Sequence, residues 1–165
     1  MTESTALARI EFSDRDVALI KASIMPENST DAELRYCVKY ASHMGLDPFA
    51  KQIYFIRRKG KIVPQIAVDG YRALAEATGE YEGQTRPEWC DENGNWRDVW
   101  LEDFPPAAAR VGVFRKGFRG ATEGIAVYRE YVQTDRDGKI TETWLKMHSH
   151  QLAKCAEVDA FKRSF

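Results

Sequence analysis

Two N-terminal segments carry hydrophobic residues at the three- and four-residue spacing of an amphipathic helix, over residues 17–24 and 34–44. Ser13 and Thr30 precede these segments, and each has an acidic residue three positions later. This spacing is typical of a capping box, which satisfies free backbone amides in the first turn of a helix. The pattern therefore predicts two amphipathic helices, the second of which ends at Gly45.

Polar and hydrophobic residues then alternate on both sides of residues 59–60, a Lys-Gly pair. This alternation favours paired strands over residues 52–58 and 61–68. Asp69 follows as the expected N-cap of a helix that Gly79 closes. The middle of the chain is thus predicted to be a basic hairpin joined to a capped helix.

The second half is predicted to be an antiparallel meander followed by a helix. Residues 81–101 alternate around an Asn-Gly turn, and residues 107–114 and 125–132 flank a glycine-rich link. Residues 141–145 are expected to extend the sheet, and a helix is expected to begin near residues 149–150. The predicted fold class is α+β, with N-terminal helices, an antiparallel hairpin or meander sheet, and central and C-terminal helices.

Composition favours one compact protein without a membrane segment. The 165 residues, 44% of them hydrophobic, suffice for one core, so residues 1–165 are expected to form a single domain. Three cysteines without a CxxC pair favour free thiols. The absence of a long apolar run or a signal peptide favours a soluble, cytoplasmic protein. Because the chain stops at an apolar position, Phe165, with no capping glycine or polar tail, it is expected to be a fragment that lacks its C-terminal extension.

Charge is unevenly distributed although the net charge is only −1. Residues 45–63 carry five basic and one acidic side chain, residues 105–121 carry four basic and none acidic, and residues 144–165 carry four and two. If these segments converge, the molecule has a basic face and an acidic face, which also favours association of unlike surfaces between copies. The alternative is that each run is simply a solvated surface.

Cations interleave with aromatic side chains in two of these segments. Single-stranded nucleic acid binds cations through its phosphates and flat side chains through its bases. The alternative for Tyr54, Phe55 and Phe114 is an ordinary place in the core. The candidate contacts are Lys51, Arg57, Arg58, Lys59 and Lys61 beside Phe49, Tyr54 and Phe55, and Arg115, Lys116 and Arg119 beside Phe114 and Phe118.

Two blocks, GLDPFAKQIY at residues 45–54 and VDGYRALAEATGEY at residues 68–81, resemble the RecT/Bet family of phage single-strand annealing proteins. The resemblance extends from about Thr30 to Phe165 through PPAAARVGVFRKGF and the WLKM to LAKCAE block. It implies a protein that is not an enzyme, needs no cofactor, binds single-stranded DNA without ATP and anneals complementary strands. The matching basic residues, expected as main DNA contacts, are Lys51, Arg110, Arg115, Lys116, Lys154 and Lys162.

The resemblance also implies partners. These are single-stranded DNA, the annealed duplex intermediate and further copies of the chain in a ring or helical filament, together with a partner exonuclease and a host single-strand-binding protein. Two positions depart from the family pattern: His148 stands where proline often follows WxKM, and Asp159 stands where an apolar residue is usual in the last helix. Because an unpaired buried carboxylate is costly, Asp159 is expected to be exposed, or paired with Arg163 or Lys162.

Other function classes have weaker sequence support. Asp69, Glu76 and Glu80 near Lys51 would suit a metal-dependent nuclease, although carboxylates on a helix usually face solvent. The cysteines and histidines lack paired zinc-ligand spacing, and no GxxxxGK[ST] pattern is present. A protein-interaction module without DNA activity remains the other alternative.

Overall fold

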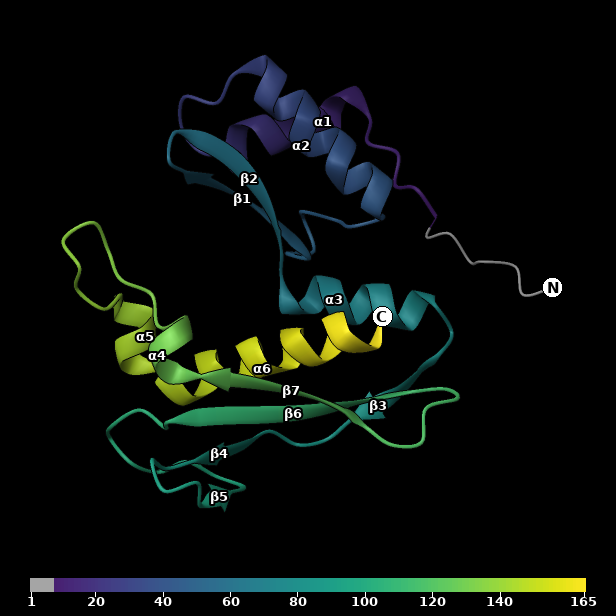
Figure 1. Cartoon of the computed structure of the whole chain (residues 1–165). Coiled ribbons are helices and arrows are strands. Elements are labelled where there is room, and N and C mark those ends of the chain that lie inside the picture. The colour runs from purple at the N-terminus through teal and green to yellow at the C-terminus, as the bar shows by residue number, and fades with distance from the viewer. Residues whose placement is uncertain (1–7) are drawn as a thin grey trace. The chain divides into compact units, whose positions relative to one another are not determined.

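The computed structural model describes residues 8–165, which gather into two compact units (Figure 1). Unit 1 spans Met1–Gly79 and unit 2 spans Glu80–Phe165. Both combine helices with antiparallel strands, so the α+β prediction is confirmed. Within the described residues, no helix is both long enough and apolar enough to cross a membrane. Cys37, Cys90 and Cys155 are free thiols, as expected.

Unit 1 begins with the two predicted helices, and both capping boxes form. The Ser13 and Thr30 hydroxyls each accept a backbone amide of the first turn, and Gly45 ends the second helix with φ 66°. Inward residues of these helices meet the hairpin in one core that includes Ile20, Cys37 and Ile53, all fully buried. The elements are α1 (Asp14–Ser23), α2 (Asp31–Met44), β1 (Ile53–Arg58), β2 (Lys61–Ile66) and α3 (Val68–Ala77).

The β1–β2 hairpin forms where the sequence predicts it, with Ile53 opposite Ile66 and Arg58 opposite Lys61. Its two turn residues, 59 and 60, have φ values of 49° and 76°, as a type I′ turn requires. This turn type matches the twist of the flanking strands and therefore fixes their register.

The expected helix follows the hairpin, but Asp69 is not its N-cap. Ala67 occupies the cap position, and no side chain caps the first turn of α3. Asp69 lies inside that turn, where its carboxylate pairs with Arg72 at 2.8 Å and complements the helix dipole. The strand before it ends at Ile66 rather than at residue 68, because Val68 already belongs to α3.

Unit 2 is a five-stranded sheet covered on one face by a long helix (Figure 1). The central strand, β6, pairs with β7 along one edge and with β3 and β4 along the other, and β4 also pairs with β5. Ala109 and Val111 of β6 face Leu152 and Ala156 of the helix in the core. The elements are β3 (Tyr81–Gln84), β4 (Glu88–Cys90), β5 (Trp96–Arg97), β6 (Ala108–Arg115), β7 (Thr122–Val127) and α6 (His148–Ser164).

Three expectations for unit 2 are corrected. Residues 128–131, expected as the end of a strand, form α4 (Tyr128–Tyr131). Residues 141–145, expected to extend the sheet, lie in α5 (Glu142–Lys146), where Glu142 and Lys146 pair one turn apart. An edge-on contact at 5.8 Å between Tyr128 and the buried Trp144 joins the two short helices. The expected 81–101 hairpin is limited to β4 and β5, because β3 pairs with β6.

Strand β7 approaches α6 unusually closely at Gly124. A Cβ atom at this position would lie 2.2 Å from both the Ala156 carbonyl oxygen and the Ala160 amide nitrogen. Alanines at 153, 156 and 160 are all buried, so small side chains on α6 complete the contact. Only glycine allows the two backbones to pack at this distance.

The carboxylate of Asp159 is paired, as expected from sequence. It accepts hydrogen bonds from Arg163 Nε at 2.8 Å and from the Ile125 amide at 3.3 Å. Ile125 of β7 lies opposite Arg110 of β6. Hydrogen-bonded and non-hydrogen-bonded pairs alternate along an antiparallel ladder. Because the Tyr128 amide donates to the Ala107 carbonyl, the pair of Arg110 and Ile125 is a non-hydrogen-bonded one. The Ile125 amide therefore points to the free edge of β7, where Asp159 satisfies it.

We expect Asp159→Leu to lower the melting temperature although it adds apolar surface. The substitution leaves the Ile125 amide without its acceptor and breaks the pair with Arg163, at a cost of about 1–2 kcal/mol. Thermal denaturation followed by circular dichroism measures the effect. Asp159→Asn is the control, because its amide oxygen can still accept from Ile125. A melting temperature above wild type for the leucine variant would contradict this account.

Candidate nucleic-acid interface

The outward side of the unit 1 hairpin combines apolar and cationic side chains. Side chains alternate between faces along a strand, so cross-strand partners share a face. Tyr54 and Val63 on this side are 44% and 43% exposed, and Arg58 donates to Gln65 Oε1 at 2.8 Å. We define the hairpin face by three cross-strand pairs: Tyr54 with Gln65, Ile56 with Val63, and Arg58 with Lys61.

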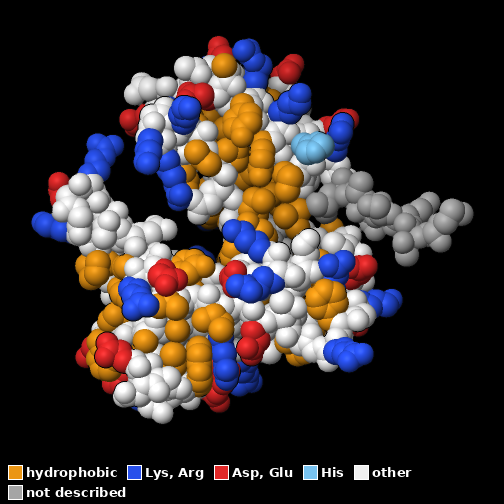
Figure 2. All heavy atoms as spheres, in the orientation of Figure 1, with side chains coloured by type: hydrophobic (Ala, Val, Ile, Leu, Met, Phe, Trp, Pro, Cys, Tyr) orange, Lys and Arg blue, Asp and Glu red, His pale blue; other side chains and the backbone are white. Residues whose placement is uncertain are grey.

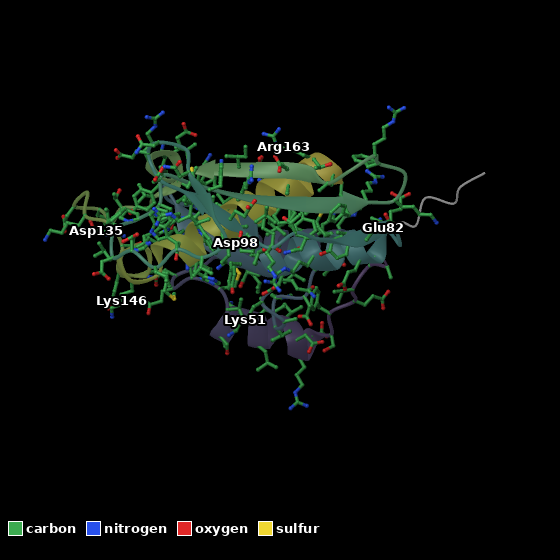
Figure 3. The ribbon with its side chains drawn as sticks, turned by 90° about the horizontal axis from the view of Figure 1, so that it is seen from below. Lys51, Glu82, Asp98, Asp135, Lys146 and Arg163 are labelled. Carbon is green, nitrogen blue, oxygen red and sulfur yellow. The ribbon has the colours of Figure 1, made fainter. Side chains whose placement is uncertain are left out.

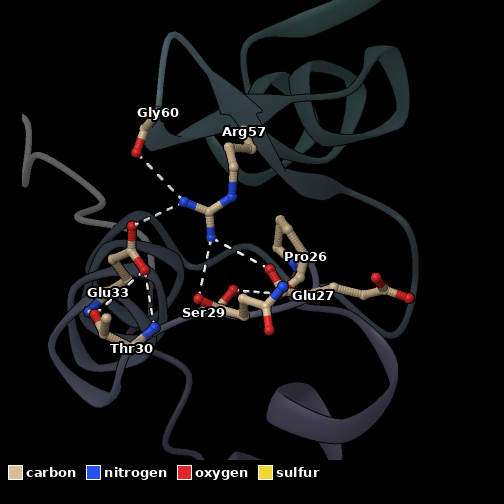
Figure 4. Close-up of polar contacts among 8 residues, drawn as sticks. Pro26, Glu27, Ser29, Thr30, Glu33, Arg57 and Gly60 are labelled. Atoms are coloured by element: carbon tan, nitrogen blue, oxygen red, sulfur yellow. Dashed lines mark hydrogen bonds and ion pairs between the residues drawn. The ribbon is translucent and has the colours of Figure 1, made fainter.

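Arg57 faces the other side of the hairpin and is held by several acceptors (Figure 4). Its Nη1 lies 3.4 Å from Glu33 Oε1 and 3.3 Å from the Gly60 carbonyl oxygen. Its Nη2 donates to the carbonyls of Glu27 and Asn28 at 3.4 and 3.5 Å. This geometry ties the hairpin to the start of α2 and favours a structural role for Arg57.

Three lysines and one aromatic ring extend the cationic surface of unit 1. The side chains of Lys51, Lys59 and Lys61 are exposed, and Figure 3 marks Lys51. Phe49, in the turn before β1, is 45% exposed. Phe55, by contrast, is 5% exposed and belongs to the core. For this ring, the alternative of a place in the core is therefore correct, and Phe55 is not a DNA contact.

In unit 2, the arginine at the end of β6 contacts two exposed phenylalanine rings. The Arg115 guanidinium lies 5.5 Å from the centre of the Phe118 ring and 5.0 Å from that of Phe165. These rings are 50% and 40% exposed. We define the turn cluster as Arg115, Lys116, Phe118, Arg119 and Phe165; its Lys116 and Arg119 side chains are also exposed.

Other contacts fix Arg115 in place. Its Nη2 lies 2.6 Å from Glu80 Oε2, and its Nη1 donates at 2.5 Å to the Ser164 carbonyl oxygen at the end of α6. A cation at a helix C-terminus is stabilised by the helix dipole. The turn of segment 105–121 and the end of segment 144–165 therefore meet at the turn cluster, whereas segment 45–63 belongs to unit 1.

Arg110 lies on the opposite face of β6 from Arg115, because the two residues are an odd number of positions apart. Its Nε donates to Glu88 Oε2 at 2.7 Å, and its guanidinium stacks 4.3 Å from the centre of the Trp96 ring. The hydrogen bond with the Glu88 carboxylate raises the pKa of Arg110. The turn cluster and Arg110 are thus separate places on unit 2.

The candidates on α6 differ in exposure. Lys154 is half-buried and Lys162 is exposed, both on the long helix that covers the sheet. The neighbouring Arg163 points away from the ribbon in Figure 3 and pairs with Asp159. Lys162 and Arg163 occupy the last turn of α6, whose final carbonyl receives Arg115. This end of the helix therefore adds charge beside the turn cluster.

The carboxylates weighed for a nuclease are engaged elsewhere or point into solvent. Asp69 pairs with Arg72, Glu80 pairs with Arg115, and Glu76 is exposed on α3. In the described part of the chain, no group of three or more histidine, cysteine, aspartate or glutamate side chains is placed to hold a metal ion.

The model of the RecT family matches residues 11–165. The chain belongs to the RecT family. RecT proteins anneal single DNA strands in phage recombination and are not classical enzymes, which confirms the recognition made from sequence. No curated protein matches the chain.

Sequence reasoning missed part of the turn cluster. The sequence marks Phe165 only as the apolar position at which the chain stops, yet its ring stacks on Arg115. The role of Glu80 as the partner of Arg115 was also missed, because the two residues are 35 positions apart. Helical spacing could only have shown that Phe165 shares the last turns of α6 with two cations.

Proposed function

We propose that this RecT protein binds single-stranded DNA without ATP and anneals complementary strands as an oligomer. The turn cluster carries this proposal: a fixed guanidinium contacts two exposed rings, next to two further cations. Bases stack on such rings whatever their sequence, and the cations attract the phosphates. A protein that recruits two strands in this way needs no bond-making chemistry to favour their pairing.

The hairpin face is the proposed second contact. Exposed Tyr54 offers a flat side chain, and Arg58, Lys59 and Lys61 gather at the tip of the hairpin. The two units would then act as one DNA-binding and oligomerisation domain over residues 1–165. Arg57 is engaged with Glu33 in unit 1 and Arg110 with Glu88 in unit 2, which favours a positioning role for each arginine within its own unit.

The remaining partners follow from the family resemblance. The annealed duplex is the product that the oligomer would hold, and we place the protein in the cytoplasm, where phage DNA recombines. A partner exonuclease and a host single-strand-binding protein stay as predictions.

An annealing assay without ATP tests the proposal. Two complementary labelled oligonucleotides are added one after the other, and energy transfer is compared with a protein-free control and a pre-formed duplex. We expect faster annealing and a product that stays bound to protein. Binding without acceleration would reduce the function to single-strand binding, and no DNA binding would favour the protein-interaction module. Loss of DNA that depends on added magnesium would instead favour the nuclease.

We expect Lys51→Gln and Lys154→Gln each to flatten the dependence of single-strand affinity on salt. Each phosphate neutralised contributes about 0.7 to the slope of log affinity against log salt, so the slope should fall by about that amount per lysine. Fluorescence anisotropy with a labelled oligonucleotide measures it. Lys139→Gln, in an exposed turn of unit 2, is the matched control. A slope equal to wild type would remove that lysine from the interface.

A further inference from the structure

The connection between β5 and β6 exposes hydrophobic side chains among carboxylates. Leu101 is 86% exposed, Val99 59% and Phe104 58%. Residues 91–104, here called the acidic loop, contain five acidic side chains and one basic side chain, Arg97. Contiguous exposed apolar residues rimmed by charge mark interaction sites. Because its carboxylates repel phosphates, this loop is suited to a protein partner rather than to DNA.

Internal contacts hold the acidic loop in one shape. Trp100 is buried, donates from Nε1 to the Phe104 carbonyl at 2.8 Å, and meets the Phe104 ring edge-on at 5.7 Å. Arg97 pairs with Glu102 at 2.9 Å. The Asp103 carbonyl oxygen lies 3.2 Å from His148 Nε2 at the start of α6. Leu101 is thus presented on a preformed loop, which lowers the entropic cost of docking.

Unit 1 has a groove whose apolar and basic lining complements the acidic loop. It lies between α2 and the segment that leads into α1, and is here called the α1–α2 groove. Its volume is about 550 Å³, and Phe12, Val17 and Val38 supply apolar lining. Arg35 and Lys39, one helical turn apart on α2, line it as cations, and Glu11 is a carboxylate in its lining. Among residues 8–165, no carboxylate lies within 4.0 Å of either cationic group.

Hydrophobic side chains also gather on the face of unit 1 that Figure 2 shows, with basic side chains along both sides. The groove itself is the counterpart of the acidic loop: its apolar lining lies beside Arg35 and Lys39, whereas the apolar side chains of the loop lie among carboxylates. Opposite charges around two apolar surfaces give both attraction and register.

We propose that the acidic loop of one copy docks in the α1–α2 groove of a second copy. Leu101 enters the apolar groove, and Asp98 and Asp103 face Arg35 and Lys39. Asp98, marked in Figure 3, and Asp103 form no ion pair with any other described residue. Since the two surfaces differ, a pair of copies joined in this way still has one unoccupied acidic loop and one unoccupied groove. Further copies can therefore add head to tail.

This contact would join the copies of the oligomer in the proposed function, and it rests on that function. The hairpin face and the turn cluster take no part in the docking and stay available to DNA. Self-association can therefore be measured without DNA, and DNA binding can be measured at protein concentrations below those of assembly. Loss of association through this contact would leave single-strand binding intact, and loss of DNA binding would leave association intact.

A charge-swap cycle on the full chain tests the contact. Sedimentation velocity over a concentration series gives the association constant of wild type, Lys39→Glu, Asp98→Lys and the double variant. Each single swap sets like charges face to face and should weaken association at least about tenfold. The double variant restores opposite charges and should recover most of the loss. Leu101→Ser should weaken association without changing the melting temperature.

Lys139→Glu, an exposed lysine of unit 2 outside both surfaces, is the control and should associate as wild type does. Association unchanged by the single swaps, or a double variant no better than either single, would overturn the proposal. A wild-type protein that stays monomeric at all concentrations would also overturn it. Anisotropy with a short oligonucleotide then shows separately whether each variant still binds DNA.

Discussion

Gly124→Ala is expected to unfold unit 2 at temperatures where the wild-type protein is folded. The added Cβ would lie 2.2 Å from backbone atoms of Ala156 and Ala160, which cannot rotate away as a side chain can. Strand β7 and α6 must therefore separate, although they share the core. Overpacking typically costs about 1–3 kcal/mol, and a clash with backbone should reach or exceed the upper end. Thermal denaturation should show a melting temperature lower by about 10 °C or more.

Gly120→Ala is the matched control for this experiment. Gly120 lies in the connection between β6 and β7, just before the strand that contains Gly124, and a Cβ there would meet no atom within 4 Å. The control variant should melt close to wild type, which separates the clash from any general effect of removing a glycine. Equal melting temperatures for the two variants would show that β7 and α6 do not pack as closely as described.

Local rules accounted well for the elements whose signals lie within a few residues. The capping boxes at Ser13 and Thr30 and the Lys-Gly turn at 59–60 were predicted from sequence and are present. Each depends on hydrogen bonds or φ values set by neighbours along the chain. The same rules placed the end of α2 at Gly45.

Tertiary contacts decided the segments that the sequence patterns misassigned. Residues 128–131 begin and end with tyrosine, a residue that favours strands, but the Tyr128 ring meets Trp144 of α5, and the chain turns into a helix there. Residues 141–145 contain threonines and a tryptophan that favour a strand, yet Trp144 buries its side chain from a single helical turn. Burial against a distant partner outweighed propensity in both cases.

In the candidate site, too, local signals were predicted from sequence and tertiary contacts were not. Sequence identified which segments are basic and which rings interleave with them, and Phe118 proved exposed as expected within a turn. It could not show that Glu33 engages Arg57 or that Glu88 engages Arg110, because those pairs join residues more than 20 positions apart. The contacts of Arg115 with two rings likewise depend on where the last turn of α6 lies relative to β6.

Phe118→Ala and Phe165→Ala are expected to weaken single-stranded DNA binding, each by about tenfold. Base stacking on an aromatic side chain contributes about 1–3 kcal/mol, and about 1.4 kcal/mol corresponds to a factor of ten. Because neither substitution removes a charge, the dependence of affinity on salt should keep its wild-type slope. Fluorescence anisotropy with an oligothymidine at several salt concentrations measures both quantities for each variant.

Phe114→Ala is the matched control, since Phe114 is 39% exposed on the face of β6 away from Arg115. It should bind DNA as wild type does. If Phe114→Ala lost as much affinity as Phe118→Ala, the DNA would contact the open face of the sheet, and Arg110 with Trp96 would become the better candidate site. A flattened salt slope for Phe118→Ala would show instead that the ring acts by holding Arg115, because the loss would then come from a displaced cation rather than from stacking.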